Sequence, residues 1–350
     1  MSYTNGLDKP SDYFETVIYV GGTTDISSLD FQPDFVWGKK RTGAENHALF
    51  DSVRGATKTI NSNTNAVEST RSGSLTSFDS DGFTMGGSDG IISSSGNNYV
   101  AWNWKAGGSA SSNSNGSITS TVSANTTSGF SIVSYTGSST NPSTVGHGLG
   151  TAPAMIIVKN RSTSGRDWVI WHKALGGASS TADLLLFTTD AKITSGGYWG
   201  SSAPSSTTFG VGNTNNNNAN GNNHIAYCFA EKKGYSKFGS YTGNGNADGT
   251  FVYTGFSPSF VLLKETSNAN NWMIFDNKRS PFNLMDDFIS PDISDAESTG
   301  NANNRMDMLS NGFKIRGTGS ATNRSGSNFI FMAFAKSPFT TSTGIPTTAR

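Results

Sequence analysis

Phe31-Gln-Pro-Asp-Phe-Val-Trp-Gly-Lys39 is the most informative segment of this chain, because the chain contains it three times in altered form. Its counterparts are Leu149-Gly-Thr-Ala-Pro-Ala-Met-Ile-Ile-Val-Lys159 and Phe256-Ser-Pro-Ser-Phe-Val-Leu-Leu-Lys264, and in each copy a lysine follows a proline by six residues. The prolines are 120 and 105 residues apart, far beyond the periods of about 20 to 50 residues that mark solenoid repeats. Each copy therefore belongs to a unit long enough to be a domain.

Further patterns recur at matching places around these segments. An aromatic residue followed by glycine opens each unit, an apolar pair closed by a polar residue follows the lysine, and an asparagine six residues before an aromatic ends the unit. The closing aromatics are Trp104, Phe229 and Phe334, and we expect them to occupy one equivalent core position, with Pro33, Pro153 and Pro258 opening equivalent strands. The predicted organisation is an N-terminal arm at 1–12, repeats at 13–106, 129–234 and 235–339, a linker rich in Gly, Ser, Asn and Thr at 107–128, and a tail at 340–350.

The composition favours strands and turns. Gly, Ser, Thr and Asn dominate the polar residues, and no run of ten or more residues repeats apolar positions at helical spacing. Short apolar runs bounded by Gly, Asn and Ser clusters are typical of strands. The expected fold is all-β: three tandem antiparallel β-sandwich domains of the same, jelly-roll-like fold, arranged as a rigid rod or a cluster.

The charge balance excludes some partners. Twenty-five basic and twenty-five acidic residues cancel, and only 14% of the chain is charged, so there is no electrostatic footprint for nucleic acid or an anionic membrane. The first residues contain no apolar signal-peptide core, and no apolar stretch approaches the roughly 18 residues of a membrane span. We expect synthesis in a host cytoplasm without a signal peptide and without membrane insertion.

Catalytic and metal-binding patterns are weak. Gly86-Gly-Ser-Asp-Gly90 matches the nucleophile elbow of hydrolases, but no strand and helix flank it, which favours a turn. The four histidines lie in separate segments, and the single Cys228 sits in an apolar string that predicts a buried, inert thiol. An acidic stretch at 286–297, with Asp286, Asp287, Asp292, Asp295 and Glu297, is either a structural calcium site or, as we favour, a solvated loop. No catalytic residue, cofactor or metal ligand is predicted.

The repeated lysines and one loop remain as candidates for contacts. Lys39, Lys159 and Lys264 are expected to end apolar strands with their charges in water. Trp199 stands beside Tyr198 in a loop peculiar to the second unit, and an asparagine-rich run follows. Aromatic faces can stack on sugars and asparagine amides can hydrogen-bond hydroxyls. The predicted contact surface consists of Tyr198, Trp199, Asn213, Asn215, Asn216, Asn217 and Asn218.

Four strings of the first unit resemble a family. They are Phe31-Gln-Pro-Asp-Phe-Val-Trp37, His47-Ala-Leu-Phe-Asp-Ser-Val-Arg-Gly55, Ser74-Leu-Thr-Ser-Phe-Asp-Ser-Asp-Gly-Phe83 and Tyr99-Val-Ala-Trp-Asn-Trp-Lys-Ala106. Together they resemble a repeated β-sandwich module of virion structural proteins, tail-fibre-like or decoration proteins, of marine tailed phages. Asp30 stands where that repeat usually has Gly. The resemblance implies a structural module of a virus particle and supplies no catalytic motif.

The expected function is therefore a non-enzymatic virion component. One placement is a tail fibre or tail-associated protein that binds host-surface glycan; the other is a capsid decoration or cement protein, and a polysaccharide-degrading enzyme is a minor alternative. Expected partners are other virion proteins of the tail or capsid and copies of the same chain, with a trimer as one option.

Overall fold

The computed structural model describes residues 6–176, 183–200 and 202–347. Within these residues the prediction of an all-β chain is confirmed: apart from the 3-10 turn η1 (Pro10–Asp12) and the short helix α1 (Ser320–Asn323), the regular elements are antiparallel strands. Three large sheets share one strand order. The first is β1 (Phe14–Val20), β9 (Asn98–Trp104), β3 (Phe35–Lys40), β4 (Ala48–Asp51); the second has β12 (Phe130–Thr136), β19 (Asn223–Phe229), β14 (Met155–Asn160), β15 (Val169–His172); the third is β20 (Ser236–Thr242), β26 (Asn328–Pro338), β22 (Phe256–Glu265), β23 (Met273–Asp276).

The three sheets also share one register. Trp104 pairs with Phe35, Phe229 pairs with Met155, and Phe334 pairs with Phe260. The three repeated prolines each lie two residues before these partners; Pro33 and Pro153 precede their strands, whereas Pro258 lies inside β22 at a register shift. The closing aromatics therefore occupy the same place in each sheet, while the exact boundaries of the repeats remain a prediction.

A smaller sheet covers the outer face of each large one, which makes each unit sandwich-like. The small sheets are β2 (Asp25–Ile26), β8 (Gly82–Met85) and β7 (Leu75–Asp79); β13 (Ser143–Gly146) and β18 (Thr208–Val211); and β21 (Phe251–Tyr253), β25 (Gly312–Ile315) and β24 (Met306–Leu309). Successive side chains of a strand point to opposite faces of the sheet, so each large sheet contributes apolar side chains to two cores. Val36, for example, packs in the outer core of the first unit and its neighbour Trp37 in the central core.

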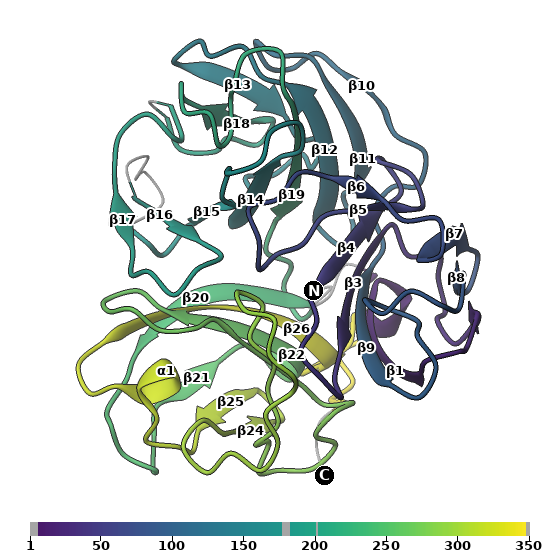
Figure 1. Cartoon of the computed structure of the whole chain (residues 1–350). Helices are drawn as coiled ribbons and strands as arrows, with labels where there is room; N and C mark the ends of the chain where they lie inside the picture. The colour runs from purple at the N-terminus through teal and green to yellow at the C-terminus, as the bar shows by residue number, and fades with distance from the viewer. Residues whose placement is uncertain (1–5, 177–182, 201, 348–350) are drawn as a thin grey trace.

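The inner faces of the three large sheets share that central core, so the units form a cluster around a common centre (Figure 1). The rings of Trp104, Phe229 and Phe334 meet there: their centroids are 6.2 Å apart for Trp104 and Phe229, 5.7 Å for Trp104 and Phe334, and 6.1 Å for Phe229 and Phe334. Aromatic pairs at such separations are favourable contacts. The aromatic position that recurs in all three units thus forms one triangular cluster at the centre.

Equivalent hydrogen bonds join each unit to its neighbour, and the third of them joins the third unit back to the first. The ring nitrogens of Trp168 and Trp272 donate hydrogen bonds to the carbonyl oxygens of Asn61 and Leu186, both at 2.8 Å. At the matching position His47 Nε2 lies 3.1 Å from the carbonyl oxygen of Ser290. These bonds connect the second unit to the first, the third to the second and the first to the third.

The described residues of the segments interpreted as arm, linker and tail belong to the folded body. Within 107–128, β10 (Ser111–Asn113) and β11 (Ser120–Asn125) extend the second large sheet, so this segment contains strands as well as connecting residues. In the arm, Leu7 is buried in the central core, and the Asp8 carboxylate accepts a hydrogen bond from the Ser342 N–H of the tail at 2.7 Å. The remaining short strands are β5 (Lys58–Thr59), β6 (Ser69–Thr70), β16 (Asp183–Leu186) and β17 (Ile193–Thr194).

Candidate functional site

The predicted contact surface of the second unit is largely structural. Trp199 is 2% exposed in the outer core of that unit, and Tyr198 is half-buried against the same core. Asn217 and Asn218 are fully buried; Asn216 is half-buried, and only Asn213 and Asn215 are exposed. The expectation of an exposed contact surface is therefore wrong for Trp199, Asn217 and Asn218, and a contact through the accessible members stays a prediction.

The asparagine-rich run closes the second unit in a way that the third unit repeats. The Tyr135 hydroxyl donates to the carbonyl oxygen of Asn217 at 2.6 Å, and the Tyr241 hydroxyl donates to that of Thr322 at 2.7 Å. Asn218 Oδ1 accepts the Ser138 N–H at 2.8 Å, and Asn323 Oδ1 accepts the Asn244 N–H at 2.9 Å. A buried asparagine that hydrogen-bonds several backbone groups fixes a loop.

The repeated lysines were predicted to reach water, and this was wrong. Lys39, Lys159 and Lys264 are fully buried, and burial lowers the pKa of each to about 8. Their ammonium groups donate to backbone carbonyls: Lys39 to Ser294 at 3.2 Å, Lys264 to Thr189 at 2.9 Å, and Lys159 to Arg166. For Lys39 and Lys264 the acceptor lies in the neighbouring unit. Lys39 and Lys264 therefore bind units together, whereas Lys159 fixes a loop of its own unit.

The histidines and the acidic residues of 286–297 do not gather into a metal site in the described part of the chain. His47, His147, His172 and His224 are buried, with each pKa lowered chiefly by burial. Glu297 forms ion pairs with Arg41 and Arg279 at 2.8 and 2.9 Å. In the described part of the chain, no group of three or more His, Cys, Asp or Glu residues is placed to hold a metal ion.

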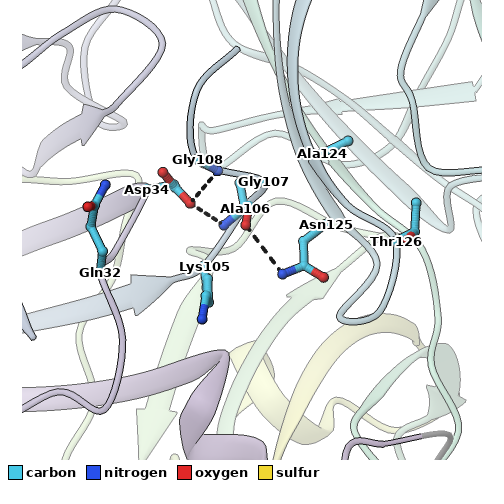
Figure 2. Close-up of a pocket in the computed structure, with 9 residues that line it drawn as sticks. All are labelled: Gln32, Asp34, Lys105, Ala106, Gly107, Gly108, Ala124, Asn125 and Thr126. Atoms are coloured by element: carbon cyan, nitrogen blue, oxygen red, sulfur yellow. Dashed lines mark hydrogen bonds between the residues drawn. The ribbon is translucent and has the colours of Figure 1, made fainter. Parts of the chain in front are cut away.

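One pocket lies at the junction between the first and second units, with a volume of about 450 Å³ (Figure 2). Its carboxylate belongs to Asp34, which accepts hydrogen bonds from the N–H groups of Ala106 and Gly108 at 2.8 and 3.3 Å and from the Ser52 hydroxyl at 2.9 Å. Burial nevertheless raises the pKa of Asp34. Both oxygens of this carboxylate accept hydrogen bonds that fix the segment between the first and second units. We therefore assign Asp34 a structural role and no ligand.

A second pocket, which we call the three-loop pocket, receives residues from all three units. Its volume is about 490 Å³, and residues 62–65, 167–168, 187–189 and Asp292 line it. The loops begin at matching points, because Ile60, Leu185 and Ile289 pair with the second residues of β4, β15 and β23. The third residue after each of these points lines the pocket, and the three residues are Asn63, Thr188 and Asp292.

Asp292 is the unusual member of this set. It is 7% exposed, and burial raises the pKa of its carboxyl to about 7. Oδ1 accepts the Trp272 N–H at 3.2 Å, and Oδ2 has no hydrogen-bond partner among the described residues. Sequence reasoning placed Asp292 only within an acidic stretch; aligning the three loops on their apolar first residues would have separated it from its acidic neighbours.

A third pocket lies at the surface of the third unit and contains exposed aromatic rings. Its volume is about 530 Å³, and Lys233, Tyr253, Phe339 and Thr340 are among its lining residues. Tyr253 is 62% exposed and Phe339 is 43% exposed. Unlike the buried Trp199, these exposed rings are accessible for stacking on a sugar.

Residues 9–338 match a protein family described as a domain of unknown function, DUF7483. The chain belongs to this family. The DUF7483 region spans the three large sheets, from η1 to the end of β26. Comparisons with curated proteins and with solved structures gave no match. None of the helices in the described residues is long and apolar enough to cross a membrane.

Proposed function

We propose that this DUF7483 chain is a non-enzymatic structural component of a bacteriophage virion, placed in the tail as a fibre or tail-associated protein that contacts host-surface glycan. The resemblance of the four strings at 31–106 to virion modules motivates the class of protein. The observation that carries a structural role is the central core shared by three sheets, with Trp104, Phe229 and Phe334 in mutual contact. A body of this kind can transmit load without hinges between its units.

The buried polar groups also support a structural role. The three lysines donate to backbone carbonyls, and Asp34 accepts hydrogen bonds at a junction, so these groups hold loops and units in place. Perturbed pKa values are common at catalytic sites but also arise in structural networks. The lysines and Asp34 have hydrogen-bond partners that explain their positions, whereas Asp292 Oδ2 is among the buried polar atoms that have none among the described residues.

Copy number in purified particles tests the proposal. We expect peptides of this chain in density-purified virions, at a few to tens of copies relative to the major capsid protein in quantitative mass spectrometry. Immunogold labelling should then mark the tail. Hundreds of copies with label over the head would instead establish the capsid decoration alternative. Absence of the chain from infectious particles would overturn the virion assignment altogether.

Whether copies of this chain associate, with a trimer as one option, can be measured directly. The chain already brings three similar sheets around one centre, an arrangement that three separate chains would otherwise have to form. Light scattering on the purified full chain measures whether further copies associate, and a trimer would add a true threefold arrangement to the internal one.

A further inference from the structure

We propose that the three-loop pocket binds one sugar residue of a neutral glycan, with Asp292 Oδ2 accepting hydrogen bonds from the sugar hydroxyls. This inference rests on the proposed contact with host-surface glycan and gives that contact a location. It moves the site from the second-unit loop, where the sequence placed it, to the point where loops of all three units meet.

The unpartnered carboxylate oxygen is the first observation. Asp292 is more than nine-tenths buried and lines the pocket, and its Oδ2 has no partner in the part of the chain that the structure describes. Buried polar atoms in native proteins nearly always have a hydrogen-bond partner, so an orphan needs an explanation such as a ligand or water. A hydroxyl group is a suitable donor, because hydrogen bonds to carboxylates are among the stronger ones in proteins.

The matching residue of the first unit shows that a carboxylate is not needed to build the loop. Asn63 Oδ1 accepts the His47 N–H at 3.0 Å, as Asp292 Oδ1 accepts the Trp272 N–H at 3.2 Å. The remaining amide nitrogen of Asn63 donates to Asn46 Oδ1 at 2.7 Å, so that side chain is satisfied on both sides. The structural task is therefore met by an amide, and Asp292 differs by retaining an open acceptor.

The rest of the lining fits a small hydroxylated molecule. Thr64, Thr188 and Thr189 contribute hydroxyl-bearing side chains, and Asn65 contributes an amide. Trp168 and Phe187 also line the pocket, but at 1% and 4% exposure they form its apolar floor and offer no free ring face. The volume of about 490 Å³ lies within the roughly 300 to 1,000 Å³ typical of small-molecule sites.

Other ligand classes suit the pocket less well. Calcium takes six to eight oxygen ligands, usually including several carboxylates, and no group of three acidic, histidine or cysteine residues gathers in the described chain. An anion would meet the carboxylates of Asp167 and Asp292, both of which line the pocket. A neutral hydroxyl donor avoids both difficulties.

Saturation-transfer-difference NMR on the full chain tests the inference, with the methyl glycosides of glucose, galactose and mannose as probes. We expect saturation transfer to at least one glycoside with wild type. Asp292→Asn copies the residue of the first unit and should fold. At about pH 8, above the pKa of about 7, the Asp292 carboxyl is mostly ionised, and the substitution should weaken binding at least about tenfold because the charged acceptor is lost. Tyr253→Ala, which changes only the exposed aromatic pocket of the third unit, should bind as wild type does.

Thr189→Trp supplies a second variant, since Thr189 is exposed and holds Lys264 through its backbone. The bulky ring should fill the pocket and abolish saturation transfer while the melting temperature stays unchanged. Full binding by Asp292→Asn or Thr189→Trp, or loss of binding in Tyr253→Ala, would overturn the site. No transfer to any of the three glycosides would overturn the inference too, whereas the virion assignment is judged separately by copy number.

Discussion

The three contacts between units use the same backbone geometry with two different chemistries. Where the first unit meets the second, the Asp51 carboxylate accepts hydrogen bonds from Arg54 and, at 2.7 Å, from the Tyr227 hydroxyl. Glu68 then pairs with Arg161 at 2.8 Å. The contact between the third and first units repeats this with Asp276, Arg279, Glu297 and Arg41, and Trp102 Nε1 donates to Asp276 at 3.0 Å.

The contact between the second and third units is neutral at its buried centre. His172 stands where the others have Asp, and its Nε2 lies 3.2 Å from the carbonyl oxygen of Phe331. Leu175 replaces the arginine, and burial lowers the pKa of His172 to about 3, so the ring is uncharged at neutral pH. At the rim, the Lys192 N–H donates to the carbonyl oxygen of Thr266, as the Glu68 N–H does to that of Arg161.

The comparison shows that the acidic residue and the arginine change together. A buried carboxylate without its arginine would be an uncompensated charge, which is costly. An uncharged histidine needs no counter-ion. The fold therefore constrains the net charge of the buried pair and leaves its identity free.

Removing the aromatic centre should have the largest effect, and it tests whether the contacts can be separated at all. Phe334→Ala in the full chain should lower the free energy of unfolding by about 3 to 5 kcal/mol, because the ring contacts Trp104 and Phe229 in the shared core. Calorimetry should still show a single transition. The matched control is Phe282→Ala, since Phe282 is 81% exposed and its loss should change stability by no more than about 0.5 kcal/mol.

Two separate transitions in Phe334→Ala would mean that one unit unfolds independently, so that each contact between units would have to be assessed by itself.

Breaking an ionic contact should come next in size. Arg54→Leu leaves Asp51 buried without its cation and should cost about 3 kcal/mol, near the lower end of the range for broken buried pairs, because Leu175 shows that leucine fits the equivalent position. Adding Asp51→His to Arg54→Leu should restore most of the stability, as measured by urea unfolding. Equal stability of the single and double variants would refute the claim that the two residues are exchangeable only as a pair.

The sequence predicted the repeated architecture because each copy retains its apolar spacing. The recurrence of Trp104, Phe229 and Phe334 correctly indicated equivalent positions, but pattern alone could not show that they touch. The same limit explains the wrong prediction for the lysines. A lysine at the end of a strand normally reaches water, but a loop from a neighbouring unit, carrying Thr189 or Ser294, meets Lys264 or Lys39.

The candidate site was missed for a related reason. Trp199 does lie in a loop, but its ring is buried in the outer core together with Phe209 and Val211, and a local pattern cannot show that a loop residue is covered. The three-loop pocket depends on residues from three units that no local window contains, and Asp292 differs from Asn63 by chemistry that matters only once their shared position is known.

The smallest expected effect concerns acid sensitivity and distinguishes the two kinds of contact. The folded-state pKa of His172 is about 3, against an ordinary value of about 6.5 in the unfolded chain. Between these values the unfolded chain binds more protons, so stability is lost as pH falls below about 6.5. His172→Gln keeps a donor toward Phe331 and should reduce the slope of unfolding free energy against pH by up to about 1.4 kcal/mol per pH unit. The other buried histidines leave a residual slope.

In the opposite direction, the Asp51→His and Arg54→Leu double variant places a second histidine in a contact between units and should steepen the slope over the same range. Urea unfolding at pH 4.5, 5.5 and 7 measures both changes, and parallel curves for all three proteins would show that the histidine contact carries no acid sensitivity of its own.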